Sequence, residues 1–168
     1  MKKTLMVVLI ALACCALLTS CAGLKVAPAK FVHNNPAFSV EYPSDWKKGT
    51  TPGALLFVYT GTFKVPQMQI DKTIATGGTP EDTAKNLCKQ FKEERKSPYC
   101  KIKYAKGLKL TDGTPAQEFE IEWFGDGVPL HTAEFVIIKG KTAISATLTD
   151  IYPINEGLKT YLRSIKFE

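Results

Sequence analysis

The second half of the chain alternates β-rich runs with glycine-containing turns, and this pattern restricts the possible folds more than any other feature of the sequence. The predicted strands cover residues 100–110, 115–124, 130–139 and 142–149. Asp112-Gly113 lies between the first two, and Asp-Gly between such runs is the strongest short-range signal for a β-hairpin. Further turns are predicted at Gly125-Asp126-Gly127 and at Gly140. Strands joined by such tight turns pair antiparallel, so the sequence predicts a β-meander.

The first hairpin also allows a prediction of register. If Asp112 and Gly113 alone form the turn, Lys103 lies opposite Glu122, and charged residues face each other across the pair. Nearer the turn the same register would place Lys106 opposite Phe119. We therefore expect a bulge at Gly107 that changes the phase of the strand.

Two helices and three short strands complete the predicted elements. Thr79 is the expected N-cap of a helix with Pro80 at its first position, and Ser97-Pro98 ends it. Its apolar stripe consists of Ala84, Leu87, Cys88 and Phe91. A second helix is predicted over residues 154–164, and strands over 38–43, 54–59 and 67–76. This order predicts an α+β fold with a single antiparallel sheet packed against helices.

The N-terminus has the features of an export signal. Lys2 and Lys3 precede an uncharged stretch over residues 5–18, which is shorter than the ~20 apolar residues of a spanning helix. We expect residues 1–20 to be a signal peptide that is removed. Leu18-Thr19-Ser20-Cys21 resembles the bacterial lipobox, in which a lipid is attached to the cysteine sulfur and cleavage occurs just before it. Cys21 is the predicted lipidation site, and the alternative is ordinary signal peptidase cleavage after Ala22.

Lipidation would determine where the protein resides. Each buried CH₂ of an acyl chain contributes ~0.8 kcal/mol, so two or three chains would anchor the protein permanently. Ala22 after the cysteine resembles the default sorting pattern for the outer membrane, so we expect the protein there, facing the periplasm. Residues 21–36 are the predicted tether and 37–168 the globular domain. Loss of Lys2 and Lys3 lowers the formal net charge from +6 to +4, and export excludes nucleic acid as a partner.

The cysteines allow a specific prediction. Of the five, Cys14 and Cys15 leave with the signal peptide and Cys21 carries the lipid. Cys88 and Cys100 remain as a pair in an oxidising compartment, and we predict that they form a disulfide. The bond would join the first helix to the next strand and stabilise the fold by roughly 3 kcal/mol in the chain-entropy model. The alternative is two separate buried thiols.

The sequence offers few candidates for catalysis or metal binding. His33 lies in the tether and His131 on a strand, and no nucleophile elbow, zinc-protease, P-loop or dinucleotide-binding motif is present. We therefore expect no enzymatic activity, no cofactor and no metal.

Three groups of side chains have two interpretations each. Glu118, Glu120 and Glu122 share one face of a strand, where they either coordinate a hard cation or, as we favour, form a solvated face paired with lysines such as Lys103. A row of lysines lies on the outer side of the first helix: Lys85, Lys89, Lys92 and Lys96. These lysines either contact lipid phosphates or an acidic partner, or, as we favour, are simply exposed to solvent. Trp46 and Trp123 are expected in the core rather than in a ligand platform.

Three segments carry a resemblance to a known family. Residues 38–46 (FSVEYPSDW), 113–119 (GTPAQEF) and 161–167 (YLRSIKF) resemble the PsbP-like family, which includes the DcrB-type bacterial lipoproteins. The resemblance covers about residues 36 to 168. It implies an antiparallel sheet packed between helices and a role as a binding or assembly module without enzymatic chemistry. The family has no general catalytic motif, so it transfers no functional residue to this chain.

The sequence therefore predicts a lipid-anchored, non-enzymatic accessory or assembly module that contacts a neighbouring envelope protein. The alternative is a small-ligand carrier or sensor with a pocket between sheet and helix, for which an apolar cavity with a few polar groups would be the sign.

Overall fold

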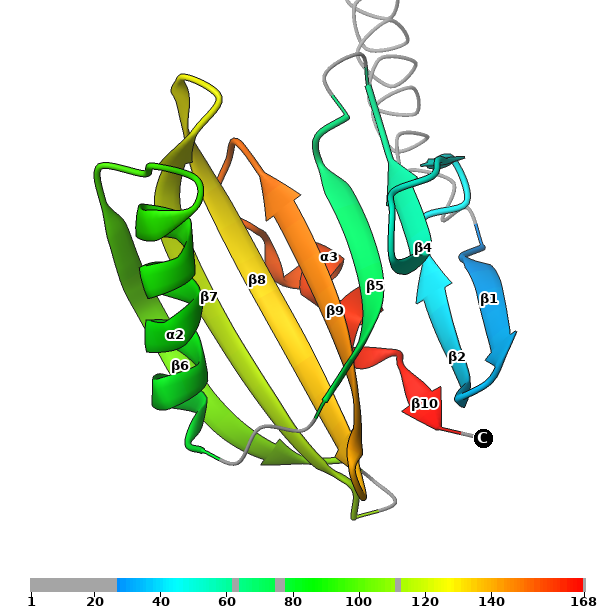
Figure 1. Ribbon diagram of the computed structural model, residues 1–168. Coiled ribbons are helices and arrows are strands. Elements are labelled where there is room, and N and C mark those ends of the chain that lie inside the picture. Colours follow the sequence, from blue (N-terminus) through cyan, green and yellow to red (C-terminus); the bar gives the residue numbers. More distant parts are fainter. Residues whose placement is uncertain (1–26, 62–63, 75–77, 111–112, 168) are drawn as a thin grey trace, which may run out of the picture.

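Figure 1 shows a computed structural model of the chain, which describes residues 27–61, 64–74, 78–110 and 113–167, and these residues form three layers. A seven-stranded sheet is the central layer, in the order β3-β4-β5-β9-β8-β7-β6. Its strands are β3 (Lys47–Lys48), β4 (Ala54–Tyr59), β5 (Gln67–Ile74), β6 (Cys100–Lys109), β7 (Pro115–Gly125), β8 (Val128–Lys139) and β9 (Thr142–Asp150). Helix α2 (Pro80–Glu93) covers one face, and α3 (Glu156–Arg163) with a small second sheet covers the other.

The prediction of a single sheet was wrong, because the two ends of the domain build a second one. Its order is β1 (Ala29–Asn34), β2 (Ala37–Tyr42) and β10 (Lys166–Phe167), all antiparallel. Strand β1 lies in the segment expected to be an irregular tether. Every residue of β1 pairs with β2, and Phe31 packs against the main core, so residues 29–34 belong to the fold rather than to a tether.

The meander is confirmed, and its first hairpin has a different register. Leu110 and Thr114 face each other through a 2.9 Å backbone hydrogen bond, so the loop holds three residues instead of two. This places Lys106 opposite Glu118, one position away from the predicted pairing. Gly113 has a φ of +82°, as the last position of a three-residue hairpin loop requires, while Asp112 lies outside the described residues.

The predicted bulge is present at a different residue. The register shifts between Ile102 and Tyr104, so Lys103 is the extra residue and Gly107 is regularly paired. The Lys103 Nζ still lies 2.6 Å from a carboxylate oxygen of Glu122, as the predicted pairing required.

Both predicted helices are confirmed. Thr79 caps α2 through a reciprocal capping box with Asp82, in which each side chain accepts from the backbone N–H of the other. Asn155 caps α3 by accepting from the N–H of Leu158. Helix α2 ends earlier than the predicted stop at Ser97-Pro98, with Glu93 as its last residue and Glu94 as its C-cap.

The central sheet separates two hydrophobic cores. Under α2, Ala84 and Cys88 pack on residues of the meander such as Phe119 and Ile121. On the opposite face, α3 and β2 enclose a larger core around fully buried residues, among them Phe38, Phe135, Ile137, Leu148 and Leu162. Trp46 belongs to this larger core and Trp123 to the core under α2, as expected of the two tryptophans.

Candidate functional site

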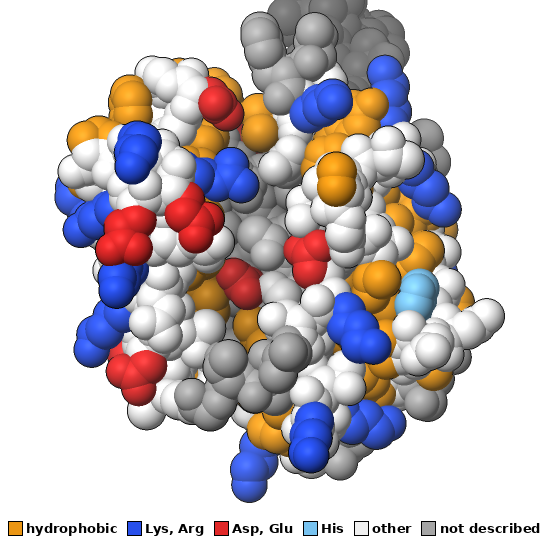
Figure 2. Space-filling model, viewed as in Figure 1, with side chains coloured by type: hydrophobic (Ala, Val, Ile, Leu, Met, Phe, Trp, Pro, Cys, Tyr) orange, Lys and Arg blue, Asp and Glu red, His pale blue; other side chains and the backbone are white. Residues whose placement is uncertain are grey.

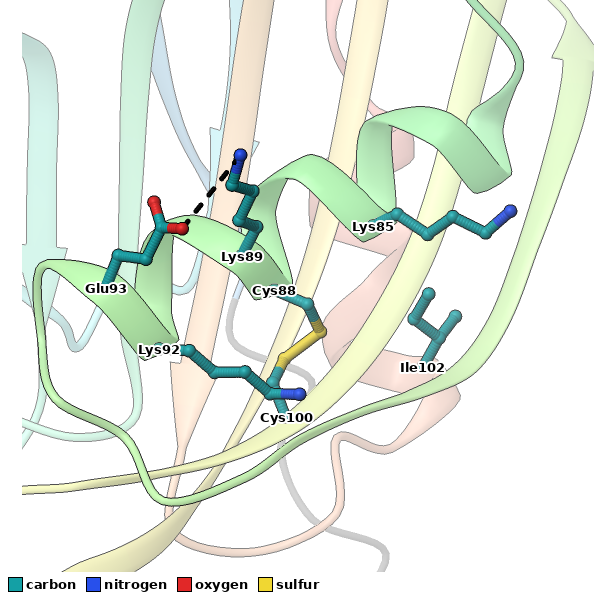
Figure 3. A pocket seen from close by; sticks show the side chains of 7 residues that line it. All are labelled: Lys85, Cys88, Lys89, Lys92, Glu93, Cys100 and Ile102. Carbon is teal, nitrogen blue, oxygen red and sulfur yellow. Dashed lines mark ion pairs between the residues drawn. A yellow bond between two sulfur atoms is a disulfide. The ribbon is translucent and has the colours of Figure 1, made fainter.

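A shallow hollow centred on a disulfide lies along the side of α2 that borders the edge strand β6 (Figure 3). Cys88 on the helix is bonded to Cys100 at the start of β6, with their Cα atoms 5.3 Å apart, in agreement with the predicted pair. The hollow has a volume of about 470 Å³ and is lined by the disulfide, Ile102 and four charged residues of α2: Lys85, Lys89, Lys92 and Glu93. The disulfide holds the helix against the edge strand, so these side chains project from a rigid base.

Positive charge dominates this hollow. Lys89 forms a weak pair with Glu93 at 3.9 Å, and both side chains are largely exposed. No ion pair of Lys85 or Lys92 is present among the described residues, and Figure 3 shows their side chains extending over the disulfide and Ile102. Ile102 is 37% exposed, an apolar side chain between cations. We call Lys85, Lys89, Lys92 and Ile102 the basic face.

Lys96 does not belong to this face, contrary to the predicted lysine row. Helix α2 ends at Glu93 with Glu94 as C-cap, and Lys96 follows in the turn with a φ of +54°. The chain has already changed direction at this point toward Ser97, whose backbone N–H donates to the Phe91 carbonyl.

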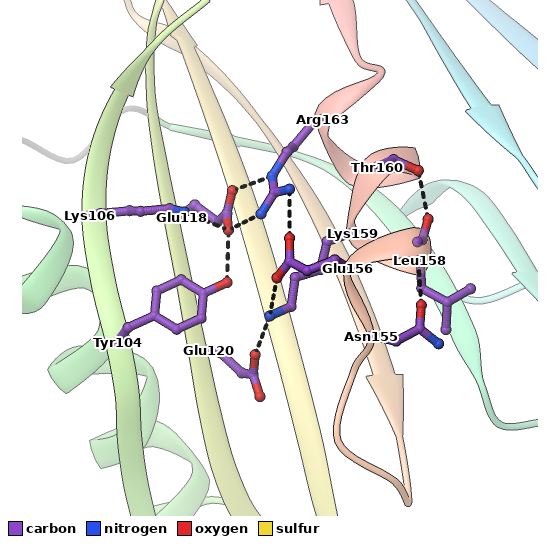
Figure 4. A network of polar contacts seen from close by, with 11 residues as sticks. Tyr104, Lys106, Glu118, Glu120, Asn155, Glu156, Leu158, Lys159, Thr160 and Arg163 are labelled. Carbon is purple, nitrogen blue, oxygen red and sulfur yellow. Dashed lines mark hydrogen bonds and ion pairs between the residues drawn. The ribbon is translucent and has the colours of Figure 1, made fainter.

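The three glutamates of β7 are paired with cations, but their face is not solvated. Glu118 is 1% exposed and Glu120 8%, because α3 lies over this part of the sheet. As Figure 4 shows, Arg163 of α3 binds both carboxylate oxygens of Glu118, at 2.7 Å each. Lys159 of the same helix lies 2.7 Å from Glu120. Glu122, nearer the strand end, pairs with Lys103, so the predicted lysine partner is confirmed while the predicted exposure of the face is wrong.

The pKa values of this network follow from its contacts. Burial alone would raise the pKa of Glu118, but hydrogen bonds from Arg163 and Tyr104 and the charges of Arg163 and Lys106 lower it to about 2. Burial and the donated hydrogen bond to Glu118 raise the pKa of Tyr104 to about 12. Glu118 therefore stays charged and Tyr104 stays neutral at neutral pH, as expected of members of a structural ion network.

Sequence reasoning missed the cations that neutralise the glutamates. Glu156, Lys159 and Arg163 recur at a spacing that places charged side chains on one face of the second helix. This charged helix face, together with the alternating glutamates of residues 118–122, was the sequence signal that could have predicted the ion pairs. Among the described residues, no group of three or more His, Cys, Asp or Glu side chains is placed to hold a metal ion.

The two histidines lie apart from each other. His33 is on β1 and stacks against Phe38, with ring centroids 5.4 Å apart. His131 is on β8, directly across from Glu122 and Asp150 on the neighbouring strands, and its buried Nδ1 has no hydrogen-bond partner among the residues that the structure describes.

A second, apolar pocket of about 650 Å³ opens at the end of the central sheet next to β10. Its apolar lining is Leu108, Leu110, Phe135, Ile165 and Phe167. Three cationic residues, Lys109, Arg163 and Lys166, complete it.

Comparison with solved structures establishes the kind of fold. The cyanobacterial PsbP protein (CyanoP) of Synechocystis sp. PCC 6803 superposes with a TM-score of 0.66 over 88% of this chain and 97% of that one, at 14% identity. The fold is PsbP-like. A Bacteroides thetaiotaomicron protein superposes with a TM-score of 0.54, also at 14% identity, over 83% of this chain and 48% of its own. No protein-family model and no curated protein matches the sequence.

Within the PsbP-like fold of the described residues, neither helix is long and apolar enough to cross a membrane. Cys21 and the expected signal peptide over residues 1–20 lie outside the described residues.

Proposed function

We propose that this protein is a lipid-anchored, non-enzymatic accessory module of a bacterial envelope complex, of the DcrB-type lipoprotein kind, which docks an acidic surface of a neighbouring protein on its basic face. The supporting observation is the basic face itself: Lys85, Lys89 and Lys92 of α2 line one hollow with Ile102 of β6, and a disulfide joins the helix to that strand. A rigid patch with an apolar centre and a charged rim is the usual anatomy of a protein-binding surface. The complementary partner surface is acidic.

Attachment through Cys21 would keep the module close to its membrane. With β1 starting at Ala29, only residues 21–28 remain as a tether, and these span at most about 28 Å when fully extended. The partner is therefore a protein at the surface of the same membrane. We propose the outer membrane, on its periplasmic side, on the evidence of Ala22 after the cysteine.

Photo-crosslinking in native envelopes tests the docking surface. A photoreactive residue at Asn86, exposed on α2, is expected to capture one reproducible partner, and the same residue at Asn34, exposed on β1, is not. The variant Lys85→Gln/Lys89→Gln/Lys92→Gln should lower this capture by about tenfold or more, equivalent to about 1.4 kcal/mol. The matched control Lys47→Gln/Lys72→Gln/Lys141→Gln removes the same charge from exposed positions elsewhere and should leave capture unchanged. Equal capture by both triple variants would refute the basic face.

The lipid anchor is tested separately by intact mass. Native protein is expected to begin at an acylated Cys21, and Cys21→Ser should release the protein from membranes. An unmodified chain that begins at Gly23 would contradict the anchor while leaving the docking surface open to the crosslinking test.

The apolar pocket beside β10 favours a second candidate function, a carrier of small amphiphiles. Apolar walls with a few polar groups are typical of ligand sites, and the cations Lys109 and Lys166 at this pocket suit an anionic head group. Calorimetric titration with dodecanoate tests this function. Saturable binding that Leu108→Glu abolishes and that dodecanol does not reproduce would support it, and equal responses to dodecanoate and dodecanol would not.

A further inference from the structure

A polar groove lies on the α2 side of the central sheet, next to the helix. Helix α2 contacts β6 and β7, so the rest of this sheet face is not covered by it. Figure 2 shows the surface hollowed between α2 and the β4–β5 side of the sheet, with acidic side chains inside the hollow. A cavity of about 210 Å³ occupies this place, lined by Gln67, Gln69, Leu87, Gln90, Phe91, Glu134, Thr147 and Thr149.

The sheet register explains why polar side chains converge in the groove. Gln69 of β5, Thr147 of β9 and Glu134 of β8 are direct neighbours across three strands. The next row along the strands holds Asp71 and Ser145. Directly paired residues point to the same face with Cβ atoms about 5 Å apart, so these rows form a continuous floor of hydrogen-bonding groups.

Two carboxylates lie in this floor without a cation. Ser145 donates to Glu134 at 2.6 Å, and the Gln69 amide donates to both oxygens of Asp71 at 3.0 and 2.9 Å. Within the described part of the chain, neither carboxylate takes part in an ion pair. Glu118 and Glu120, on the opposite face of the same sheet, differ from them because cations of α3 neutralise both.

The charged form of Glu134 is unfavourable in the groove. Burial raises its pKa to about 7, the Ser145 hydrogen bond opposes that rise, and the charge of Asp71 adds to it. Burial likewise raises the pKa of Asp71. A cation in the groove would supply the missing counter-charge.

The other charged groups nearby leave the cavity negative. Arg95, after the end of α2, is stacked over the Phe91 and Trp123 rings at 5.7 and 5.8 Å. Gln90 donates to Glu94, which adds a third carboxylate at the helix end.

We propose that this groove binds a small organic ammonium ion, with Glu134 as its charge partner. An ammonium group donates three hydrogen bonds, and a carboxylate, a threonine hydroxyl and a glutamine amide oxygen can all accept them. Leu87 and Phe91 on the helix side offer an apolar wall to the carbon chain of the ligand. A metal ion suits the groove less well, because no group of three or more His, Cys, Asp or Glu side chains among the described residues is placed to hold one. The groove is separate from the basic face, so this proposal goes beyond the docking function and does not depend on it.

Calorimetric titration of the full chain with n-butylammonium chloride tests the site. Saturable binding is expected for n-butylammonium, and none for n-butanol, which has the same chain without the charge. Glu134→Gln keeps the shape and should weaken binding by about tenfold or more. Glu122→Gln removes a carboxylate from the opposite face and should change affinity by less than about twofold.

Proton release supplies a second readout. Near pH 7, ammonium binding should expel a proton from Glu134, seen as a binding heat that depends on the ionisation enthalpy of the buffer. Above about pH 9 the carboxylate is already charged and this dependence should vanish. Equal binding of n-butanol and n-butylammonium, unchanged affinity in Glu134→Gln, tighter Glu134-dependent binding of CaCl₂, or no binding of any probe would each overturn the proposal.

Discussion

The Arg163 guanidinium donates to both carboxylate oxygens of Glu118, from Nε to one and from an Nη to the other, with both distances 2.7 Å. This side-on pair joins the last helix to the middle of β7. Tyr104 donates to the same carboxylate at 2.7 Å, and Lys106 lies 3.3 Å from it. The carboxylate is nearly inaccessible to water, so its charge depends on these donors.

Removal of the Arg163 charge should therefore destabilise the fold strongly. In Arg163→Met the buried Glu118 loses its two-point contact with the guanidinium and keeps only Tyr104 and Lys106 as partners. Removal of one partner from a buried ion pair costs about 3 kcal/mol or more. Urea unfolding followed by circular dichroism measures this loss. Glu156→Gln removes the exposed partner of the same arginine and should cost at most about 1 kcal/mol.

A double variant separates the pair from the packing of Arg163. Arg163→Met/Glu118→Leu removes both charges and should recover most of the stability lost in Arg163→Met. If the double variant is as unstable as the single one, the arginine contributes through packing alone.

Local sequence signals predicted the elements better than they predicted the layers. The capping box at Thr79 and the glycine turns depend on neighbouring residues, so the helix and the meander could be located from the sequence. The second sheet depends on the pairing of β2 with β10, for example of Ser39 with Lys166, which lie more than 120 residues apart in the sequence. No short-range pattern encodes such a pairing.

The same distinction applies to the candidate sites. The disulfide pairing followed from the number and location of the cysteines. The burial of Glu118 did not, because alternation along β7 specifies a shared face without specifying what covers it. The groove around Glu134 depends on side-by-side rows from three strands, and these rows become visible only when the strand order is known.

The Cys88–Cys100 disulfide should contribute measurably to stability. It closes a loop with a sequence separation of 12, for which the chain-entropy model gives about 3 kcal/mol. Cys88→Ala/Cys100→Ala is expected to lower the unfolding free energy by about this amount, and dithiothreitol should lower that of the wild type similarly. Thiol labelling of the unfolded, unreduced protein should find no reactive Cys88 or Cys100. Labelling of both would contradict the bond.

Glu134 should make stability fall as the pH rises. Its pKa is about 7 in the folded protein against 4.5 for the free side chain, so the folded state holds a proton that the unfolded state releases. The stabilisation is complete below pH 4.5 and is lost as the pH passes through about 7. Glu134→Gln should remove this loss and exceed the wild type by up to about 3 kcal/mol above about pH 8. Urea unfolding across this range, with the exposed Glu41→Gln as control, measures the difference; parallel profiles for all three proteins would exclude the effect.

The β7–β8 turn depends on the backbone freedom of Gly127. Asp126 and Gly127 have φ values of +51° and +82°, the left-handed conformations of a two-residue hairpin turn whose twist matches the strands. A Cβ at Gly127 would meet no other atom, but an alanine is strained at this positive φ. Gly127→Ala should therefore lower the free energy of unfolding by about 1–2 kcal/mol. Gly107→Ala is the matched control, because the nearest atom to a new Cβ there is Cγ of Pro80 at 3.9 Å and the strand conformation suits alanine. Equal thermal stability of the two variants would show that the turn adopts another conformation, whereas a loss confined to Gly127→Ala supports the left-handed turn between β7 and β8.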